Sequence, residues 1–182
     1  MSLIHLVDQK DATGEVAATY EQVKKQIGMI PNGLKAFGSS PYRLKAQVAE
    51  LGYYMTHPTL GPQLTAAIRY VVASDHQCEY CVVMNGGMLV QAGWDRGVVR
   101  ELPKNPGAAP LGVKDLAMLL TVIKAVRTPG EVNQGDISEL RSLGWTDQDI
   151  LDGVAHGAFS MAFDLILNTF KVTPDNLKSP ST

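Results

Sequence analysis

The sequence carries almost no excess charge of either sign. Its 16 Lys and Arg residues against 18 Asp and Glu residues give a formal net charge of -2. Nucleic-acid and anionic-membrane partners require clusters of basic residues, so this balance argues against both. No apolar run of the secretory-signal kind stands near the N-terminus, and Asp8 and Asp11 argue against an organellar transit peptide. We therefore expect a cytoplasmic protein with no nucleic-acid partner and no membrane partner.

A long hydrophobic run is also lacking. The most apolar late stretch, residues 157–167, is interrupted by Asp164 and is too short to span a bilayer. Hydrophobic residues make up 45% of the chain and charged residues 19%, which is typical of a soluble globular protein. A length of 182 residues is enough for one well-buried domain.

Strand signals are missing as well. No segment alternates polar and apolar residues or offers a hairpin turn pair, whereas apolar residues recur at helical spacing almost throughout. We predict an all-α helical bundle that forms a single domain over residues 1–182. Its expected parts are N-terminal helices in 1–60, a core motif in 61–102, a linker in 103–112, C-terminal helices in 113–172 and a flexible tail in 173–182.

Two segments of the chain echo each other. "GWDRGVV" begins at Gly93 and "GWTDQDI" begins at Gly144, and each places a β-branched residue five positions beyond its Trp. An apolar helical stretch precedes each segment at nearly the same offset. The echo predicts two related helical halves packed on each other, unless common helix-end residues coincide by chance.

Cysteine is scarce, and the only two cysteines, Cys78 and Cys81, are three residues apart. In a chain without an export signal, such a pair is more typical of catalysis or metal binding than of a structural disulfide. Two buried thiols could also be inert core residues. A structural zinc site needs four ligands, and only His76 and a distant residue such as His156 could complete one. A thioredoxin-like site requires a βαβ pattern, which the sequence lacks.

The cysteines stand at the expected start of a helix over residues 79–91. Side chains three apart share a helix face with Cβ atoms about 5–6 Å apart, close to the about 3.5–4.5 Å of a disulfide. Unpaired backbone N–H groups and the positive end of the helix dipole favour a thiolate at this place. The spacing therefore permits reversible dithiol chemistry, and we expect Cys78 and Cys81 to be catalytic.

Three stretches together resemble the AhpD-like, or carboxymuconolactone decarboxylase, superfamily. They are "GMIPNGLKAFGSSPYRL", "LTAAIRYVVASDHQCEYCVVMNGGMLVQAGW" and "LGWTDQDILDGVAHGAFSMAFDLILNTF", in the order and spacing of that family. The resemblance covers most of the chain and implies a helical bundle with a redox-active C-x-x-C at a helix start. It also implies a homo-oligomer, and a trimer or hexamer is expected.

By this resemblance the chain is an alkylhydroperoxidase-like, thiol-dependent oxidoreductase. Cys81 would attack a small-molecule hydroperoxide or disulfide, and Cys78 would resolve the product as a disulfide. A disulfide-reducing protein partner would then regenerate the dithiol. No metal and no cofactor other than this Cys78–Cys81 pair is expected.

The proton relay of that family is not matched here. The family pattern expects His one turn after the second cysteine, where this chain has Asn85, and Glu on the preceding helix, where it has Ala66. Asn85, a tentative site residue, can donate a hydrogen bond to a thiolate but cannot hold a proton near neutral pH. A positioned general base typically contributes about 10²–10⁴ in rate, so low peroxidase activity is expected. His76, in the loop before Cys78, is a tentative substitute.

Other interpretations of the sequence remain open at this point. His156 on the last helix is expected to be a neutral core residue satisfied by a backbone carbonyl, or alternatively to border the thiol pocket. Met84 and Met88 are expected in the core or in a pocket wall. A lyase of the decarboxylase branch would use Arg69 and Arg96 as anchors for a diacid substrate and leave the thiols without a role. A non-catalytic oligomer for binding or regulation is the third alternative, and the missing relay is its main support.

Overall fold

Every regular element in residues 2–175, which the computed structural model describes, is helical. The α-helices are α1 (Gly14–Ile27), α2 (Asn32–Lys35), α3 (Pro41–Met55), α4 (Pro62–Asp75), α5 (Glu79–Gln91), α6 (Arg96–Glu101), α7 (Val113–Arg127), α8 (Gln134–Ser142) and α9 (Asp147–Thr169). Short 3-10 turns cover Gln9–Asp11, Pro106–Ala108 and Pro129–Glu131. The predicted all-α class is confirmed.

The helix boundaries follow local sequence signals. α1 ends at Gly28, whose φ of 86° is a left-handed conformation that glycine adopts without strain. α9 begins with a capping box, in which the Asp149 N–H donates to Thr146 Oγ1 at 3.1 Å and the Thr146 N–H donates to Asp149 Oδ2 at 2.9 Å. This box fixes the start of the helix that carries His156 and Asp164.

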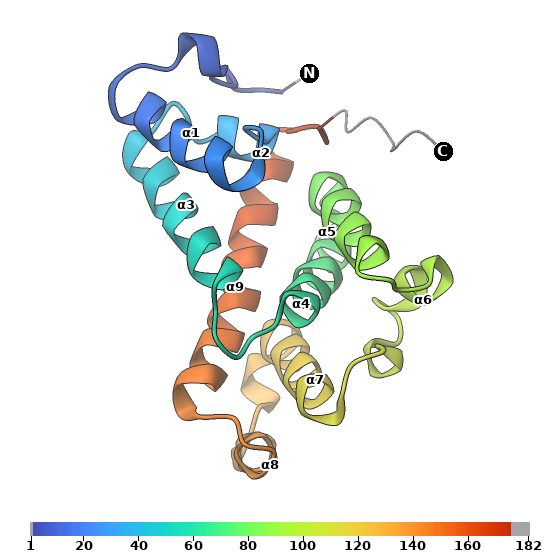
Figure 1. Cartoon of the computed structure of the whole chain (residues 1–182). Coiled ribbons are helices and arrows are strands. Elements are labelled where there is room, and N and C mark those ends of the chain that lie inside the picture. Colours follow the sequence, from blue (N-terminus) through green and yellow to red (C-terminus); the bar gives the residue numbers. More distant parts are fainter. Residues whose placement is uncertain (1, 176–182) are drawn as a thin grey trace.

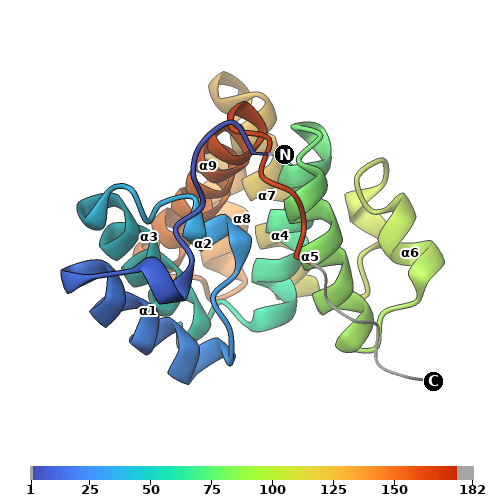
Figure 2. The same ribbon diagram turned by 90° about the horizontal axis from the view of Figure 1, so that it is seen from above.

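The longest helix, α9, is the centre of the arrangement (Figure 1). It lies between the layer formed by α1, α2 and α3 and the pair formed by α4 and α5, while α7 and α8 pack near its N-terminal end. Seen from above, the N-terminal helices and α6 lie on opposite sides of α9 (Figure 2). α4 contacts α5, α7 and α9, and its Leu64, Ile68 and Val71 are fully buried. Burial of such side chains stabilises the bundle by about 1.5–3 kcal/mol each.

The buried apolar residues form two clusters. One joins α4, α7 and the first half of α9. In the other, Val16, Tyr20 and Leu44 of the N-terminal helices belong to the same cluster as Cys78 and Cys81. The N-terminal layer therefore covers the thiols, and they lie inside the molecule.

The two Gly-Trp turns have matching local geometry. Each glycine is left-handed, with φ values of 94° and 85°. The Trp94 indole N–H donates to Gln63 Oε1 at 2.9 Å in the first turn of α4, and the Trp145 indole N–H donates to the Lys114 carbonyl at 3.0 Å in the first turn of α7. The sequence echo thus has a structural counterpart in two helix pairs, α4–α5 and α7–α8.

One described helix, α9, is long and apolar enough to cross a membrane, with a mean hydropathy of 1.4. Residues 157–167 alone are too short to span a bilayer, as expected, but the helix that contains them extends well beyond them. The core helix of a soluble protein can be equally long and apolar. α9 packs against α4 and α7, and its Asp149, His156 and Asp164 are buried. We take it as a core helix.

The C-terminal end of the described chain is held in place at Asp175. Its carboxylate accepts hydrogen bonds from the Asn32 N–H and the Tyr80 hydroxyl, both at 2.9 Å. Residues 173–175 of the predicted flexible tail are described and are not helical, whereas residues 176–182 lie outside the described part of the chain.

Candidate thiol site

The two cysteines occupy the first turn of α5, as predicted. Gln77 adopts a left-handed φ of 54° in the turn after α4, and Cys78 follows as the N-cap residue of α5. The Cys78 N–H donates to the Ala73 carbonyl at 2.9 Å, which ties the turn to the end of α4. Cys78 is 0% exposed and Cys81 is 3% exposed, and both are free thiols.

An acid from α9 completes this cluster. One carboxylate oxygen of Asp164 and the sulfurs of Cys78 and Cys81 all lie within 4.8 Å of one another. Asp164 is 2% exposed, and its Oδ2 has no hydrogen-bond partner among the described residues. Burial raises the pKa of Asp164 to about 6, although the two thiols work against this rise. The carboxyl group therefore titrates close to neutral pH.

The two thiols are electrostatically unequal. The neighbouring Cys81 thiol lowers the pKa of Cys78, because its hydrogen can be shared with a Cys78 thiolate. The pKa of Cys81 is raised, by the interaction with Cys78, by burial and by the charge of Asp164. Burial and the charge of Asp164 therefore oppose the effect of the helix start at Cys81. A helix terminus contributes about 0.3–2 kcal/mol, and burial beside a carboxylate outweighs that.

A cavity of about 570 Å³ opens beside the cluster. This size is typical of small-molecule sites, which measure about 300–1,000 Å³. Cys81 and Asp164 line the cavity, whereas Cys78 does not. The other lining residues come from α1 to α5 and from α9, and include Leu34, Glu50, Leu51, Tyr54, Met55, Ala66, Arg69, Met84, Asn85, Met88, His156, Phe159 and Phe163. Met84 and Met88 are thus wall residues, as expected.

Asn85 is committed to contacts other than a thiol. Its side-chain N–H₂ donates to the Cys81 carbonyl at 2.8 Å, and its Oδ1 accepts from Arg69 Nε at 2.7 Å. The side chain of Asn85 therefore bonds a backbone carbonyl and Arg69 rather than a thiol in this structure. Instead, Asn85, which lies one helical turn after Cys81 on α5, holds the Arg69 guanidinium at the cavity wall.

His156 is a buried residue that also borders the cavity. Its Nε2 lies 3.2 Å from Arg69 Nη1 and 3.3 Å from the Thr65 carbonyl. Burial, followed by the charge of Arg69, lowers the pKa of His156 to about 3, so the ring is neutral at physiological pH. Both expectations for His156, a neutral core residue and a neighbour of the thiol pocket, agree with its position.

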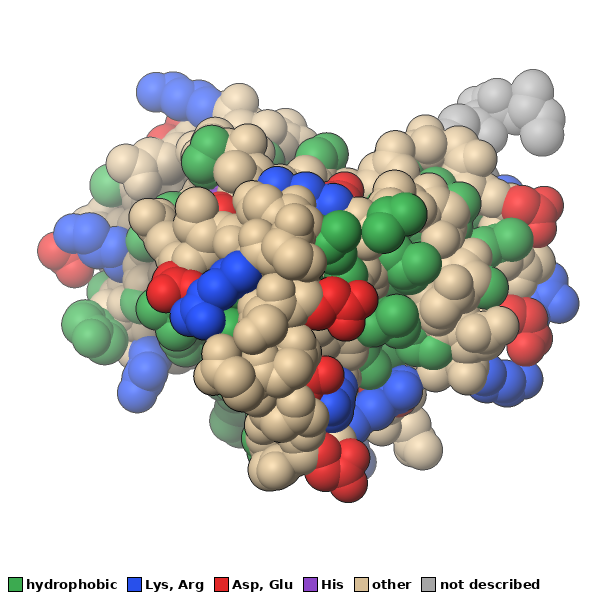
Figure 3. All heavy atoms as spheres, turned by 90° about the horizontal axis from the view of Figure 1, so that it is seen from below, with side chains coloured by type: hydrophobic (Ala, Val, Ile, Leu, Met, Phe, Trp, Pro, Cys, Tyr) green, Lys and Arg blue, Asp and Glu red, His purple; other side chains and the backbone are tan. Residues whose placement is uncertain are grey.

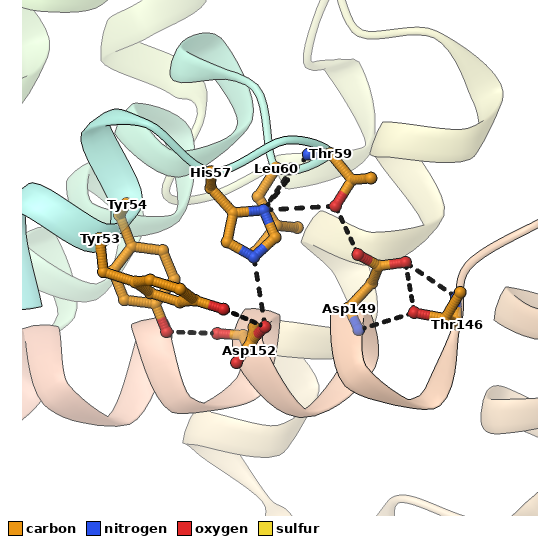
Figure 4. A network of polar contacts seen from close by, with 8 residues as sticks. All are labelled: Tyr53, Tyr54, His57, Thr59, Leu60, Thr146, Asp149 and Asp152. Carbon is orange, nitrogen blue, oxygen red and sulfur yellow. Dashed lines mark hydrogen bonds and ion pairs between the residues drawn. The ribbon is translucent and has the colours of Figure 1, made fainter.

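A second polar network joins the end of α3 to α9 (Figure 4). His57 Nε2 lies 3.2 Å from Asp152 Oδ2, which also accepts from the Tyr53 hydroxyl at 2.7 Å. The Tyr54 hydroxyl donates to the Asp152 carbonyl at 2.8 Å, and the Tyr54 ring lies 4.1 Å from the His156 ring between centroids. This network ties the end of α3 to α9 and so positions Tyr54 in the cavity wall.

Two other predicted residues do not join the site directly. His76 is half-buried at the C-terminal end of α4, and its backbone carbonyl accepts from the Asn168 side chain at 2.8 Å. No hydrogen bond from its imidazole to a thiol is present in residues 2–175, although its charge acts on Asp164. Arg96 is exposed on α6 and does not line the cavity, unlike Arg69.

The cluster also has the chemistry of a metal-binding group. Two thiolates and a carboxylate suit a borderline-soft ion such as Zn²⁺, and three protein ligands would leave one position open, as in catalytic zinc sites. Neither His76 nor His156, the ligands considered from the sequence, belongs to this group.

The amino-acid pattern did not indicate that Asp164 belongs to the candidate site. In the sequence this residue stands out only as an interruption of an apolar segment. An ionisable residue inside an apolar helical stretch is itself a signal, because burying it is costly unless it has a role. No local pattern, however, shows that this acid faces α5.

Comparison with known proteins places the fold. No protein-family model and no curated protein matches the sequence. Among solved structures, an uncharacterized peroxidase-related protein from Silicibacter sp. TM1040 is similar at 27% identity and a TM-score of 0.81, over 96% of this chain and 92% of that one. An AhpD-core, peroxidase-related protein from Ralstonia eutropha JMP134 is similar at 24% identity and a TM-score of 0.82, over 96% and 93%.

A third similar structure is an enzyme with a different activity. The debrominase Bmp8 is 15% identical, with a TM-score of 0.75 over 96% of this chain and 92% of its own. All three cover nearly the whole chain, and two of them are peroxidase-related. The predicted resemblance is confirmed at the level of the fold: this chain is folded like the AhpD-core, peroxidase-related proteins.

Proposed function

We propose that the protein is a thiol-dependent oxidoreductase in which Cys81 reacts with substrate and Cys78 resolves the product. The observation that carries this proposal is the cluster of two sulfurs and the Asp164 carboxylate at the wall of a cavity large enough for an organic molecule. Cys81 is the sulfur that meets the cavity, which supports its role as the attacking atom. Asp164 is proposed to replace the missing His and Glu of the family relay.

In the first step, the Cys81 sulfur attacks the outer oxygen of a hydroperoxide while Asp164 accepts the thiol proton. The O–O bond breaks, Cys81 is oxidised to a sulfenic acid, and the peroxide is reduced to an alcohol. The alcohol oxygen takes the proton from Asp164, which returns to its carboxylate form. A pKa of about 6 suits this exchange, because a general base works best when its pKa lies near the operating pH.

In the second step, the Cys78 sulfur attacks the sulfur of the sulfenic acid. The disulfide bond forms, and the hydroxyl leaves as water with the Cys78 proton. The two sulfurs lie within 4.8 Å, so a local movement at the helix start brings them to bonding distance. A dithiol partner then supplies the two electrons that restore both thiols.

Intact-mass measurement on reduced protein tests this proposal. After one equivalent of cumene hydroperoxide, we expect the wild type to lose two hydrogens as the disulfide forms. With dimedone present, Cys78→Ser should be trapped as an adduct on Cys81, whereas Cys81→Ser should give no adduct. Peptide mapping separates these products from methionine oxidation. Survival of both free thiols in excess hydroperoxide would reject the redox function and favour a non-catalytic scaffold.

The same assay separates two other activities. A lyase acting on a diacid would want two cationic anchors, and only Arg69 of the two predicted arginines lines the cavity. The structural neighbour Bmp8 is a debrominase, and a variant of it was solved with 2,3,4-tribromopyrrole. A bromopyrrole is therefore included as an alternative oxidant, since replacing bromine by hydrogen with release of bromide consumes the two electrons of the dithiol.

We also propose that the protein forms a homo-oligomer, a trimer or hexamer, through the outer face of α9. This face exposes Leu151, Phe159, Leu165 and Ile166, which are between 37% and 68% exposed. Hydrophobic side chains also gather on the face seen from below (Figure 3). Light scattering should give a multiple of the 19.6 kDa chain mass, and Leu165→Glu should reduce it. A monomeric wild type would refute this assembly.

A further inference from the structure

Arg69 is a cation without a charged partner inside the cavity. Its guanidinium has five N–H groups. Nε donates to Asn85 at 2.7 Å, Nη1 lies 3.2 Å from His156 Nε2, and Nη2 meets only the Met88 sulfur at 3.7 Å. None of these three partners carries a charge, because the His156 ring is neutral at physiological pH. The positive charge is therefore not balanced by the side chains that touch it.

The acids of the cavity do not balance this charge either. Glu50 and Asp164 both line the cavity, but the ion pairs within residues 2–175 include none between either acid and Arg69. Asp164 instead faces the two thiols. Burial lowers the pKa of Arg69 only to about 10, so the guanidinium stays charged at neutral pH. A half-buried cation without a counter-ion is costly, and a ligand anion would remove that cost.

The cation also lies near the proposed reacting sulfur. Asn85 bonds Arg69 Nε through its oxygen and the Cys81 carbonyl through its nitrogen. Arg69 and Cys81 both line the same cavity, so one small molecule can contact both residues. Much of the remaining wall is apolar, with Phe159 and Phe163 from α9 among its residues.

We propose that this cavity binds an amphipathic monocarboxylate, with the carboxylate on the free N–H groups of Arg69 and the apolar body against the surrounding walls. Guanidinium–carboxylate pairs of this kind are short and directional. In a substrate, the reducible group stands a few bonds from the carboxylate and reaches Cys81. Only this last point rests on the proposed function, because the binding of a carboxylate requires no reaction.

Calorimetric titration with sodium octanoate and with 1-octanol at pH 7.5 tests the proposal. The two probes share a chain length and differ in charge. We expect octanoate to bind the wild type about 10- to 100-fold more tightly, the range that a charge-assisted hydrogen-bonded pair supplies. Arg69→Met should abolish this preference, and Arg69→Lys should keep part of it because the charge remains. The matched control is Arg96→Met, which removes an exposed arginine outside the cavity and should leave the preference unchanged.

Equal affinity of the wild type for the two probes would overturn the proposal, as would an unchanged preference in Arg69→Met. If circular dichroism shows that Arg69→Met does not fold, the wild-type comparison and Arg69→Lys decide the question. The double variant Cys78→Ser, Cys81→Ser should still prefer octanoate. A protein that binds octanoate but forms no disulfide would therefore refute the redox function alone, and the reverse result would refute the carboxylate site alone.

Discussion

Asp164→Asn is expected to make the protein more stable and less active. Asparagine keeps the shape of aspartate but cannot ionise. Burial raises the pKa of Asp164 from an ordinary 3.8 to about 6, so the folded state holds this proton more tightly than the unfolded state does. Folding stability therefore falls as the pH rises between those values. At about 1.36 kcal/mol for each pH unit between them, the loss reaches about 3 kcal/mol above pH 6 and vanishes below pH 4.

Urea unfolding of reduced protein between pH 3.5 and pH 8 measures this effect. The free energy of unfolding of the variant should exceed that of the wild type by up to about 3 kcal/mol at pH 7.5 and match it at pH 3.5. The figure is an upper bound, because the variant loses the bonds from the thiols to the carboxylate. A difference between the two proteins that stays constant with pH would show that ionisation of Asp164 does not oppose folding.

Asp152→Asn, on the same helix, is the matched control, because its pH-dependent effect on stability should have the opposite sign. Burial works against ionisation of Asp152, but hydrogen bonds from Tyr53 and His57 outweigh it and hold its pKa below the ordinary value. Its stabilisation is therefore present above the unfolded-state pKa and is lost as the pH falls through the folded-state pKa. This variant should be less stable than the wild type at neutral pH and approach it in acid.

Asp164→Asn should slow the reaction although it stabilises the fold. The rate of disulfide formation with hydroperoxide should fall by about 10²–10⁴, the usual contribution of a positioned general base. The wild-type rate should rise with pH through about 6 as the carboxyl group ionises, and the variant should lack this rise. Oxidation of the variant at the wild-type rate would mean that another group accepts the proton.

Two further substitutions test how the cavity wall is supported. A Cβ at Gly157 would meet Val122 Cγ1 at 2.7 Å, so Gly157→Ala should lower the stability by about 1–3 kcal/mol in thermal unfolding. The control is Gly87→Ala. A Cβ there has no neighbour within 4 Å, so this variant should be neutral or stabilising in the same measurement. His57→Leu leaves the buried side of Asp152 without its imidazole partner and should cost about 1–3 kcal/mol. A melting temperature unchanged by His57→Leu would show that the network in Figure 4 does not hold α3 to α9.

The fold could be predicted from the sequence because its signals are local. Apolar residues at helical spacing predict α4 and α7, and the Thr146–Asp149 pair predicts the start of α9 to the residue. The left-handed glycines after α5 and α8 were likewise visible as Gly-Trp pairs. What local signals do not contain is which helices meet, since that depends on packing between segments far apart in the chain.

The candidate site was predictable to the same extent. The C-x-x-C pair and its place at a helix start follow from spacing, whereas the partners of the pair come from elsewhere in the fold. Asp164 faces the thiols only because α9 crosses α4 beside α5. Asn85 could have donated to a thiolate, but its N–H₂ donates to the Cys81 carbonyl, and its oxygen accepts from Arg69.

The residues at the positions of the family relay depend on one another. A glutamate at position 66 would place an acid on α4, one helical turn before Arg69, whereas Ala66 leaves the guanidinium free to bond Asn85 and His156. The proposed proton-accepting role then falls to the other side of the cavity, where Asp164 is buried beside both sulfurs. Separating the cation from the acid keeps the two from neutralising each other. It leaves one wall of the cavity positive, and it keeps a carboxyl group that titrates near neutral pH at the thiols.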